Sequence, residues 1–275
     1  MCGFAGFLYN RPGGLGSLEA IATQMANAIA HRGPDDSGAW ADAQAGIALG
    51  FRRLSIIDLS PAGHQPMASS GGRFVIAFNG EIYNHLELRA ELQAAGAAPA
   101  WRGHSDTETL LAGFEHWGVD ATLKRTVGMF AIALWNVQTR TLHLARDRFG
   151  EKPLYYGWTG SGAGSAFVFG SELKALRAFP GFGNAVCRQA LAQYMRFMYV
   201  PAPRSIYQGI YKLEPGCLLT IQGAAPLTAP AQPLRTPAVN DTLTLSRWWS
   251  LADVVQAGVQ NPVTDEVAAV DALER

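Results

Sequence analysis

The chain has 275 residues, 48% of them hydrophobic, which is enough for one large domain with a full core. Its 22 basic residues balance 22 acidic ones, which argues against a nucleic acid or an anionic membrane as the main partner. Three widely spaced cysteines (Cys2, Cys187, Cys217) form neither a disulfide framework nor a metal-ligand pattern, and no metal site is expected.

Targeting and membrane signals are also lacking in the sequence. No basic segment followed by a long apolar run stands at the N-terminus, and no stretch approaches the ~18 apolar residues of a membrane span. We therefore expect a chain without membrane contact in a reducing cytoplasm, where a free thiol survives.

Taken in chain order, short strands alternate with amphipathic helices over most of the chain. Ser17 predicts the start of one helix that ends before Gly33, and Asn84 with Glu87 and Ser105 with Glu108 predict two more through capping boxes. Gly96 and Gly118 are expected to end those two helices. Strands are expected over residues 4–9, 47–49, 74–78, 130–136, 141–145 and 167–169.

The spacing of these strands favours antiparallel pairing, since residues 137–140 read as a hairpin turn between two of them. Residues 222–241 carry four prolines among Ala, Thr and Gly, which indicates an extended loop or linker. Trp248 and Trp249 are expected as buried anchors, and residues 264–275 read as the start of a helix. The aromatic-rich residues 194–207 are expected to lie in an interface or in the core.

Cys2 stands directly after the initiator methionine. Removal of Met1, which is usual before a small residue, would leave Cys2 with a thiol and a free α-amine. An α-amine titrates near ~7.7–8 and a thiol near ~8.5, so the amine is a suitable general base for its own side chain. The pattern therefore predicts a nucleophile for acyl transfer activated by its own N-terminus.

Four further segments carry candidate chemistry: RGPD at residues 32–35, RRLSIID at 52–58, FNGEIYN at 78–84 and GHSDTE at 103–108. Each one alone is compatible with ordinary structure. The first suits a turn, the Asn79-Gly80 pair suits a hairpin, and Asp106 suits a helix N-terminus. Their joint occurrence, in this order behind Cys2, is what makes the pattern specific.

Together these segments resemble the class II (N-terminal-nucleophile) glutamine amidotransferase domain, and more narrowly that of glutamine-hydrolysing asparagine synthetases. The resemblance runs from Cys2 to about Trp249 and includes GMFA at 128–131, RDRFGEKPLYY at 146–156 and SELKAL at 171–176. It implies an α+β fold, the four-layer αββα sandwich of N-terminal-nucleophile hydrolases, with two antiparallel sheets between helical layers.

The resemblance also implies a role for each site residue. Cys2 would attack the side-chain amide of L-glutamine, and Asn79 and Gly80 would form the oxyanion hole. In substrate binding, Arg53 would hold the α-carboxylate, Glu81 and Asp106 the α-ammonium, and backbone groups near Leu54 and Ile56 would line the pocket. The products would be glutamate and ammonia, formed without a metal or organic cofactor.

The resemblance further implies a second, ammonia-accepting synthetase domain that uses Mg-ATP, which this sequence does not contain. We expect a glutaminase domain over residues 2–221, a Pro-rich closing segment of that domain over 222–250, and a linker with a first helix toward the synthetase domain over 251–275. The sequence leaves open whether that domain follows in the same chain or acts as a separate protein. A homodimer also remains open.

The expected function is nitrogen donation for the ATP-dependent amidation of aspartate, as in asparagine biosynthesis. Two alternatives remain open. The same hydrolysis could serve another carboxylate, such as a uronic-acid sugar in surface-polysaccharide synthesis, or the module could be non-catalytic and serve assembly or regulation. A thiol peptidase is disfavoured, because Arg53 with two carboxylates matches a free amino acid and not a peptide.

Overall fold

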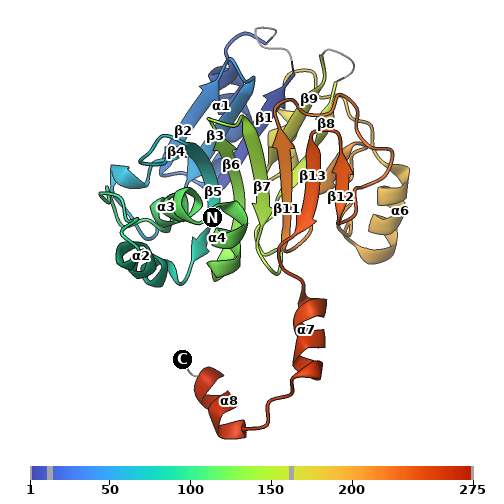
Figure 1. Cartoon of the computed structure of the whole chain (residues 1–275). Helices are drawn as coiled ribbons and strands as arrows, with labels where there is room; N and C mark the ends of the chain where they lie inside the picture. The colour runs from blue at the N-terminus through green and yellow to red at the C-terminus, as the bar shows by residue number, and fades with distance from the viewer. Residues whose placement is uncertain (1, 11–14, 161–163, 274–275) are drawn as a thin grey trace.

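Two antiparallel β-sheets packed face to face form the centre of the computed structural model, which describes residues 2–10, 15–160 and 164–273 (Figure 1). The first sheet has six strands in the spatial order β10 (Ile210–Lys212), β8 (Tyr155–Thr159), β9 (Ala166–Gly170), β1 (Gly3–Tyr9), β3 (Ile47–Arg53) and β2 (Asp36–Asp42). The second has seven, in the order β12 (Ala238–Asn240), β13 (Leu243–Arg247), β11 (Cys217–Gln222), β7 (Thr141–Arg146), β6 (Gly128–Asn136), β5 (Phe74–Ile82) and β4 (Met67–Ala68).

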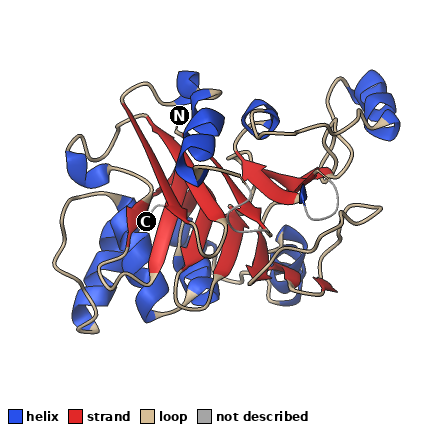
Figure 2. Cartoon of the chain, turned by 90° about the horizontal axis from the view of Figure 1, so that it is seen from above, coloured by secondary structure: helices blue, strands red, loops and turns tan. Residues whose placement is uncertain are grey.

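Helices cover the outer faces of both sheets, so that the strands occupy the middle of the molecule (Figure 2). Helices α1 (Leu18–Asn27) and α5 (Leu173–Arg177) pack on the six-stranded sheet through Leu18, Met25 and Leu176. The seven-stranded sheet is covered by α2 (His85–Ala94), α3 (Asp106–His116) and α4 (Val119–Arg125). A third apolar cluster, from facing strands of both sheets, fills the space between them. The expected αββα sandwich is confirmed.

The six expected strands are all present, and each is as long as expected or longer. Strand β3 continues to Arg53 and β5 to Ile82, so both extend into the motifs identified in the sequence. The hairpin between β6 and β7 is confirmed, with Arg140 in the left-handed region at φ 50°. Strand β2 was not expected, because two aspartates and a glycine are poor strand formers. Its pairing with β3 outweighs that preference.

Of the three helix caps, one has the expected form. Ser17 Oγ accepts a hydrogen bond from the Ala20 N–H at 3.3 Å. The capping box at Asn84 is wrong, since its side chain bonds Arg125 O and Val127 N instead. Ser105 caps α3, but the Glu108 carboxylate accepts from the N–H groups of Arg102 and Gly103 rather than from Ser105. The Asn84 carboxamide and the Glu108 carboxylate therefore hold nearby loops instead of capping their helices.

The C-terminal third completes the second sheet and then leaves it. The Pro-rich residues 222–241 are mostly loop, as expected, but include β12. Trp248 is a buried anchor stacked on Phe130 with ring centroids 5.9 Å apart, whereas Trp249 is only half-buried. Helices α7 (Leu251–Gln260) and α8 (Glu266–Leu273) then extend away from the sandwich (Figure 1).

Residues 194–199 are exposed, whereas Ser205 is buried and the partly buried Tyr207 packs against the apolar cluster that α1 and α5 form with the six-stranded sheet. Helix α6 (Arg188–Phe197) lies at the edge of the molecule, and Met195 and Met198 are 72% and 75% exposed. The core alternative thus holds only for the end of this segment, and the interface alternative stays a prediction for its exposed part. No helix among the described residues has the length and apolar character that a membrane span requires.

Candidate active site

Cys2 directly precedes β1, which runs between β3 and β9 in the six-stranded sheet. Its Sγ accepts a hydrogen bond from the Leu54 N–H at 3.3 Å and lies 3.4 Å from the Leu54 carbonyl oxygen, to which it can donate. Burial raises the pKa of the thiol, and the Leu54 N–H only partly offsets that effect. The thiol is therefore protonated near neutral pH and requires a base before it can act as a nucleophile.

Asn79 and Gly80 lie on β5, where it pairs with β6. Asn79 is 1% exposed, and its Nδ2 has no hydrogen-bond partner within the part of the chain that the structure describes. Gly80 is held so close to β6 that an added Cβ would lie 2.4 Å from the Met129 carbonyl oxygen. An unpaired buried donor is costly, which makes the Asn79 amide available to a ligand oxygen.

Arg53 ends β3 with a buried guanidinium. It donates through Nη1 to the Ser60 carbonyl at 3.0 Å and through Nη2 to the Asp58 carbonyl. An added Cβ at Gly63 would overlap the guanidinium, so a side chain there would displace Arg53 from its present position. The other N–H groups of the planar fork have no hydrogen-bond partner among the described residues and can bind a carboxylate.

Asp106 begins α3 and is 5% exposed, with Oδ2 accepting the Ile82 N–H at 2.9 Å. Burial raises the pKa of its carboxyl to about 6, and the nearby Glu81 carboxylate adds to the rise. Two acidic side chains close together form a site for a cation such as an ammonium group.

One small pocket brings seven of the eight predicted site residues together. Its walls include Cys2, Arg53, Leu54, Ile56, Gly80, Glu81 and Asp106, which come from four separate parts of the sequence. Asn79 is not part of the wall itself but directly precedes Gly80, which is. The cavity of about 60 Å³ has room for only a few water molecules.

Comparison with known proteins decides the family. The profile of the glutamine amidotransferase domain matches residues 1–229. The chain belongs to this family. Asparagine synthetase 1 of Bacillus subtilis, a glutamine-hydrolysing enzyme by its name, is 41% identical over 229 residues, covering 83% of this chain and 34% of that protein. Asparagine synthetase 3 of the same organism is 35% identical over 223 residues, covering 80% and 34%.

The amidotransferase domain thus spans about a third of the length of these curated relatives. A solved structure, the glutamine phosphoribosylpyrophosphate amidotransferase of B. subtilis, matches 90% of this chain and 49% of that chain with a TM-score of 0.61. At 18% identity it supports the fold alone.

Several residues that shape the pocket of this amidotransferase domain were not predicted as site residues. Asp58 accepts from the Ser60 N–H and the His104 N–H at 2.8 and 2.9 Å, and so joins the loop after β3 to the loop before α3. Gln65 lines the pocket and accepts from the Phe78 N–H at 2.7 Å. Asp58 lay within a quoted motif, but no pattern in the sequence distinguishes Gln65, which is buried, from the other glutamines of the chain.

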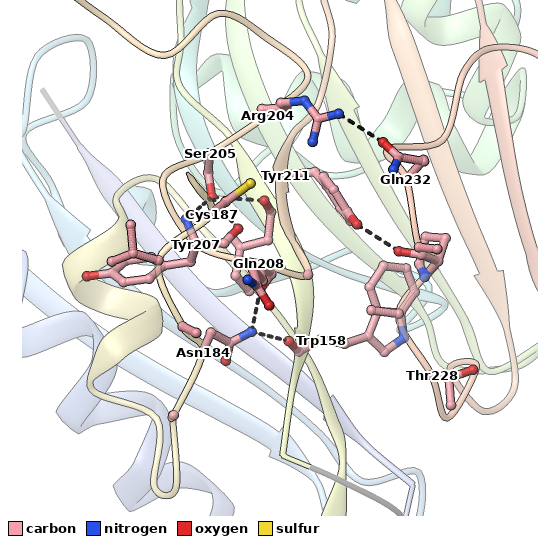
Figure 3. A pocket seen from close by; sticks show the side chains of 18 of the residues that line it. Trp158, Asn184, Cys187, Arg204, Ser205, Tyr207, Gln208, Tyr211, Thr228 and Gln232 are labelled. Atoms are coloured by element: carbon pink, nitrogen blue, oxygen red, sulfur yellow. Dashed lines mark hydrogen bonds between the residues drawn. The ribbon is translucent and has the colours of Figure 1, made fainter. Parts of the chain in front are cut away.

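A much larger groove, of about 1050 Å³, lies between the loops around residues 181–189 and 226–232 (Figure 3). It contains none of the predicted site residues. Several of its polar side chains bond to its own walls: Asn184 donates to the Trp158 and Gln208 carbonyls, and Tyr211 to the Pro230 carbonyl. The described residues contain no cluster of three acidic, histidine or cysteine side chains that could hold a metal ion.

Proposed function

We propose that this chain hydrolyses L-glutamine to glutamate and ammonia as the nitrogen-donor part of an asparagine-synthetase-type amidotransferase. The observation that carries the proposal is the pocket itself. A partly buried thiol, the Gly80 backbone, the Arg53 cation and the Glu81–Asp106 pair line one small cavity, and the buried, unpaired Asn79 amide directly precedes Gly80. These are the groups that a free amino acid with a side-chain amide would need.

Catalysis would begin at Cys2 once Met1 has been removed. The free α-amine takes the thiol proton while Sγ attacks the side-chain amide carbon of glutamine. The developing oxyanion accepts hydrogen bonds from Asn79 Nδ2 and the Gly80 N–H, and one such donor is worth ~2.7–4 kcal/mol in the transition state. The amine then returns the proton to the leaving nitrogen, and ammonia departs from a γ-glutamyl thioester. Water hydrolyses the thioester to glutamate and regenerates the thiol.

Substrate recognition would use the two charged ends of the pocket. The guanidinium of Arg53 would bind the α-carboxylate, and Glu81 with Asp106 would bind the α-ammonium. Leu54 and Ile56 supply the wall between them. The cavity is smaller than a molecule with ten non-hydrogen atoms requires, so the segment after β3 that contains these residues would shift outward on binding.

The ammonia acceptor would be a synthetase domain that activates a carboxylate with Mg-ATP, in the same chain or as a separate protein. The names of the relatives support aspartate as that carboxylate. We propose residues 2–250 as the glutaminase part and residues 251–275 as the connection toward the synthetase. Hydrolysis itself would need no cofactor.

Glutamate release from L-glutamine tests the proposal, using chain whose Cys2 N-terminus has been verified by mass spectrometry. We expect turnover with the native sequence and none with Cys2→Ala, since no other group can form the thioester. N-acetyl-glutamine should not be hydrolysed, because acetylation removes the ammonium charge that Glu81 and Asp106 would bind. Turnover by Cys2→Ala, with its fold verified by its melting temperature, would refute the nucleophile assignment.

A further inference from the structure

We propose that Glu172 is a positioning residue for the nucleophile and acts through Arg32 on the backbone of Cys2. The inference rests on the proposed function, because it concerns the group that would perform the hydrolysis. Neither residue lines the pocket that Cys2 and Leu54 share.

Arg32 connects Cys2 to Glu172 directly. It ends the short helix η1 (Ala30–Arg32), and its Nε donates to the Cys2 carbonyl oxygen at 2.9 Å. Its Nη1 donates to Glu172 Oε1, also at 2.9 Å. The Arg32 side chain is only 10% exposed, so the two bonds form largely out of water and are stronger than a surface ion pair would be.

Glu172 is itself firmly placed. It follows β9, where the neighbouring Ser171 bonds twice to Phe4 of β1: its Oγ accepts the Phe4 N–H at 3.1 Å and its N–H donates to the Phe4 carbonyl at 2.9 Å. The carboxylate therefore starts from backbone that is already joined to the strand carrying Cys2.

Three cationic or polar groups surround the Glu172 carboxylate: Arg32, His31 Nε2 at 3.0 Å and Lys174 Nζ at 3.2 Å. Partial burial opposes ionisation, but hydrogen bonds from these three groups outweigh it and lower the pKa of Glu172. The carboxylate is therefore charged at neutral pH and holds the guanidinium in one orientation.

The hydrogen bond to the Cys2 carbonyl has a particular consequence for an N-terminal residue. After Met1 removal no preceding peptide plane restrains Cys2, so its Cα, with the amine and the side chain attached, can turn about the bond to the carbonyl carbon. The carbonyl bond to Arg32 restrains the rotation between Cα and the carbonyl carbon, and with it the direction in which the amine and the side chain together leave the start of β1. Since the amine is the proposed base and the thiol the proposed nucleophile, this restraint sets how both are placed relative to the pocket and a substrate in it.

Gly3 supports the same reading. A Cβ at this position would lie 2.8 Å from Arg32 Cδ, so a side chain at residue 3 would require the Arg32 side chain to shift from its present path to Cys2. Three positions distant in sequence, at residues 3, 32 and 172, thus combine to hold one carbonyl group.

The experiment compares Glu172→Gln and Arg32→Ala with the native chain in three measurements. These are kcat for glutamine hydrolysis, the dissociation constant of L-glutamate as a non-reacting probe, and the rate at which iodoacetamide alkylates Cys2, read by peptide mapping to separate it from Cys187 and Cys217. A misplacement near 1 Å can reduce a rate by about 100-fold. We expect kcat and Cys2 alkylation to fall by roughly that factor in Arg32→Ala and less in Glu172→Gln, with glutamate affinity unchanged.

Chemical rescue separates positioning from mere stability. Guanidinium ion at sub-denaturing concentration should restore part of the activity of Arg32→Ala, while an equal concentration of sodium chloride should not. Asp120→Asn is the matched control, since it removes a carboxylate from the exposed Lys124–Asp120 pair (2.6 Å) on α4 and should leave all three measurements unchanged.

Native kcat and native Cys2 alkylation in Glu172→Gln would overturn the proposal, as would a lower melting temperature with both rates unchanged. The alkylation rate also keeps this test separate from the proposed function. If the native chain releases no glutamate while Glu172→Gln still slows alkylation, the glutaminase proposal fails and the positioning role stands.

Discussion

Two acidic groups of the pocket, the Cys2 thiol and the Asp106 carboxyl, are both shifted toward their protonated forms, with burial as the main cause for each. For Cys2 the shift makes an adjacent base necessary. For Asp106 it means that the negative charge needed to bind an ammonium group is half present at about pH 6 and nears completion only well above that pH. At neutral pH Asp106 therefore carries a negative charge that its burial disfavours, and groups with such shifted pKa values are common in ligand sites.

Asp106→Asn should make the chain more stable but weaken its binding of glutamine. An ordinary aspartate has a pKa near 3.8, whereas that of Asp106 is about 6. The contribution of the Asp106 carboxyl to the free energy of unfolding is therefore fully present below pH 3.8 and is lost as pH rises through about 6. The amide removes that penalty and can still accept the Ile82 N–H. We expect the free energy of unfolding at about pH 8 to rise by up to ~3 kcal/mol, with no gain near pH 4, and KM for glutamine to increase.

Urea unfolding at both pH values and initial-rate kinetics check this prediction. The native chain should also show a rising KM as pH falls below about 6, and the variant should lose most of that dependence. Asp58→Asn is the contrasting variant. Hydrogen bonds from Ser60 hold the pKa of Asp58 below its usual range, so its loss should destabilise at neutral pH. Equal stability of native chain and Asp106→Asn at high pH would contradict the assignment.

Arg53→Ala should chiefly weaken glutamine binding. Losing a hydrogen bond to a charged group costs about 1.5–3 kcal/mol of binding free energy, which corresponds to a KM increase of roughly 10–100-fold. Arg53→Lys should recover only part of the loss, because an ammonium cannot form the planar fork. Arg125→Ala, which removes an exposed arginine on α4, serves as control. Unchanged KM in Arg53→Ala would argue against the carboxylate-binding role.

At the scale of the elements, the pairing of β5 with β6 places the proposed oxyanion donors, and Gly80 sets how closely they pair. We expect Gly80→Ala to lower kcat by about 100–1,000-fold, as loss of one oxyanion donor does, because its Cβ would displace the backbone from Met129. Steady-state kinetics measure it. Gly258→Ala on α7, where an added Cβ meets nothing, is the matched glycine substitution and should be silent.

Some of the strands and helix caps could be predicted from the sequence, and others could not. Strands with alternating apolar residues, such as β5 and β6, were predictable from their own composition. Strands β11 and β13 were not expected, since their burial depends on pairing across a Pro-rich loop. Asn84 and Glu108 show the same limit for caps, because a cap pattern does not reveal that a loop 40 residues away, or an arginine six residues back, competes for the side chain.

The pocket follows a similar division. Residues whose chemistry is local to a motif, such as Cys2, Arg53 and Asp106, were predictable by resemblance, and the fold brings them together. Arg32 lay in a quoted motif without an assigned contact, and Glu172 is 140 residues away from it. A contact between residues so far apart in the sequence forms only when β1 pairs with β9. No local sequence pattern encodes that pairing.

On the scale of the whole molecule, the sandwich and its C-terminal helices are separate in packing. Every residue of α7 is exposed, including Val254, Val255 and Val259, whereas Leu243, Leu245 and Trp248 just before it are buried. The boundary between packed and unpacked chain therefore lies near Ser250.

A chain ending at Ser250 should melt at the same temperature as the 275-residue chain, because nothing buried is removed. A chain ending at Thr236 should lose at least about 5 kcal/mol of stability, since it lacks β12, β13 and the buried Trp248. Differential scanning calorimetry of the three chains measures both effects. A large drop in melting temperature for the chain ending at Ser250 would show that α7 or α8 stabilises the sandwich.

The central place of β1 has a consequence during synthesis on the ribosome. Cys2 is among the first residues to emerge, but the strands on either side of β1 end at Arg53 and Gly170, and Glu172 follows later still. More than half of the chain must leave the exit tunnel before these long-range partners can meet. Until then the first thiol made is without a pocket, so the proposed hydrolysis could begin only after Glu172 has left the tunnel.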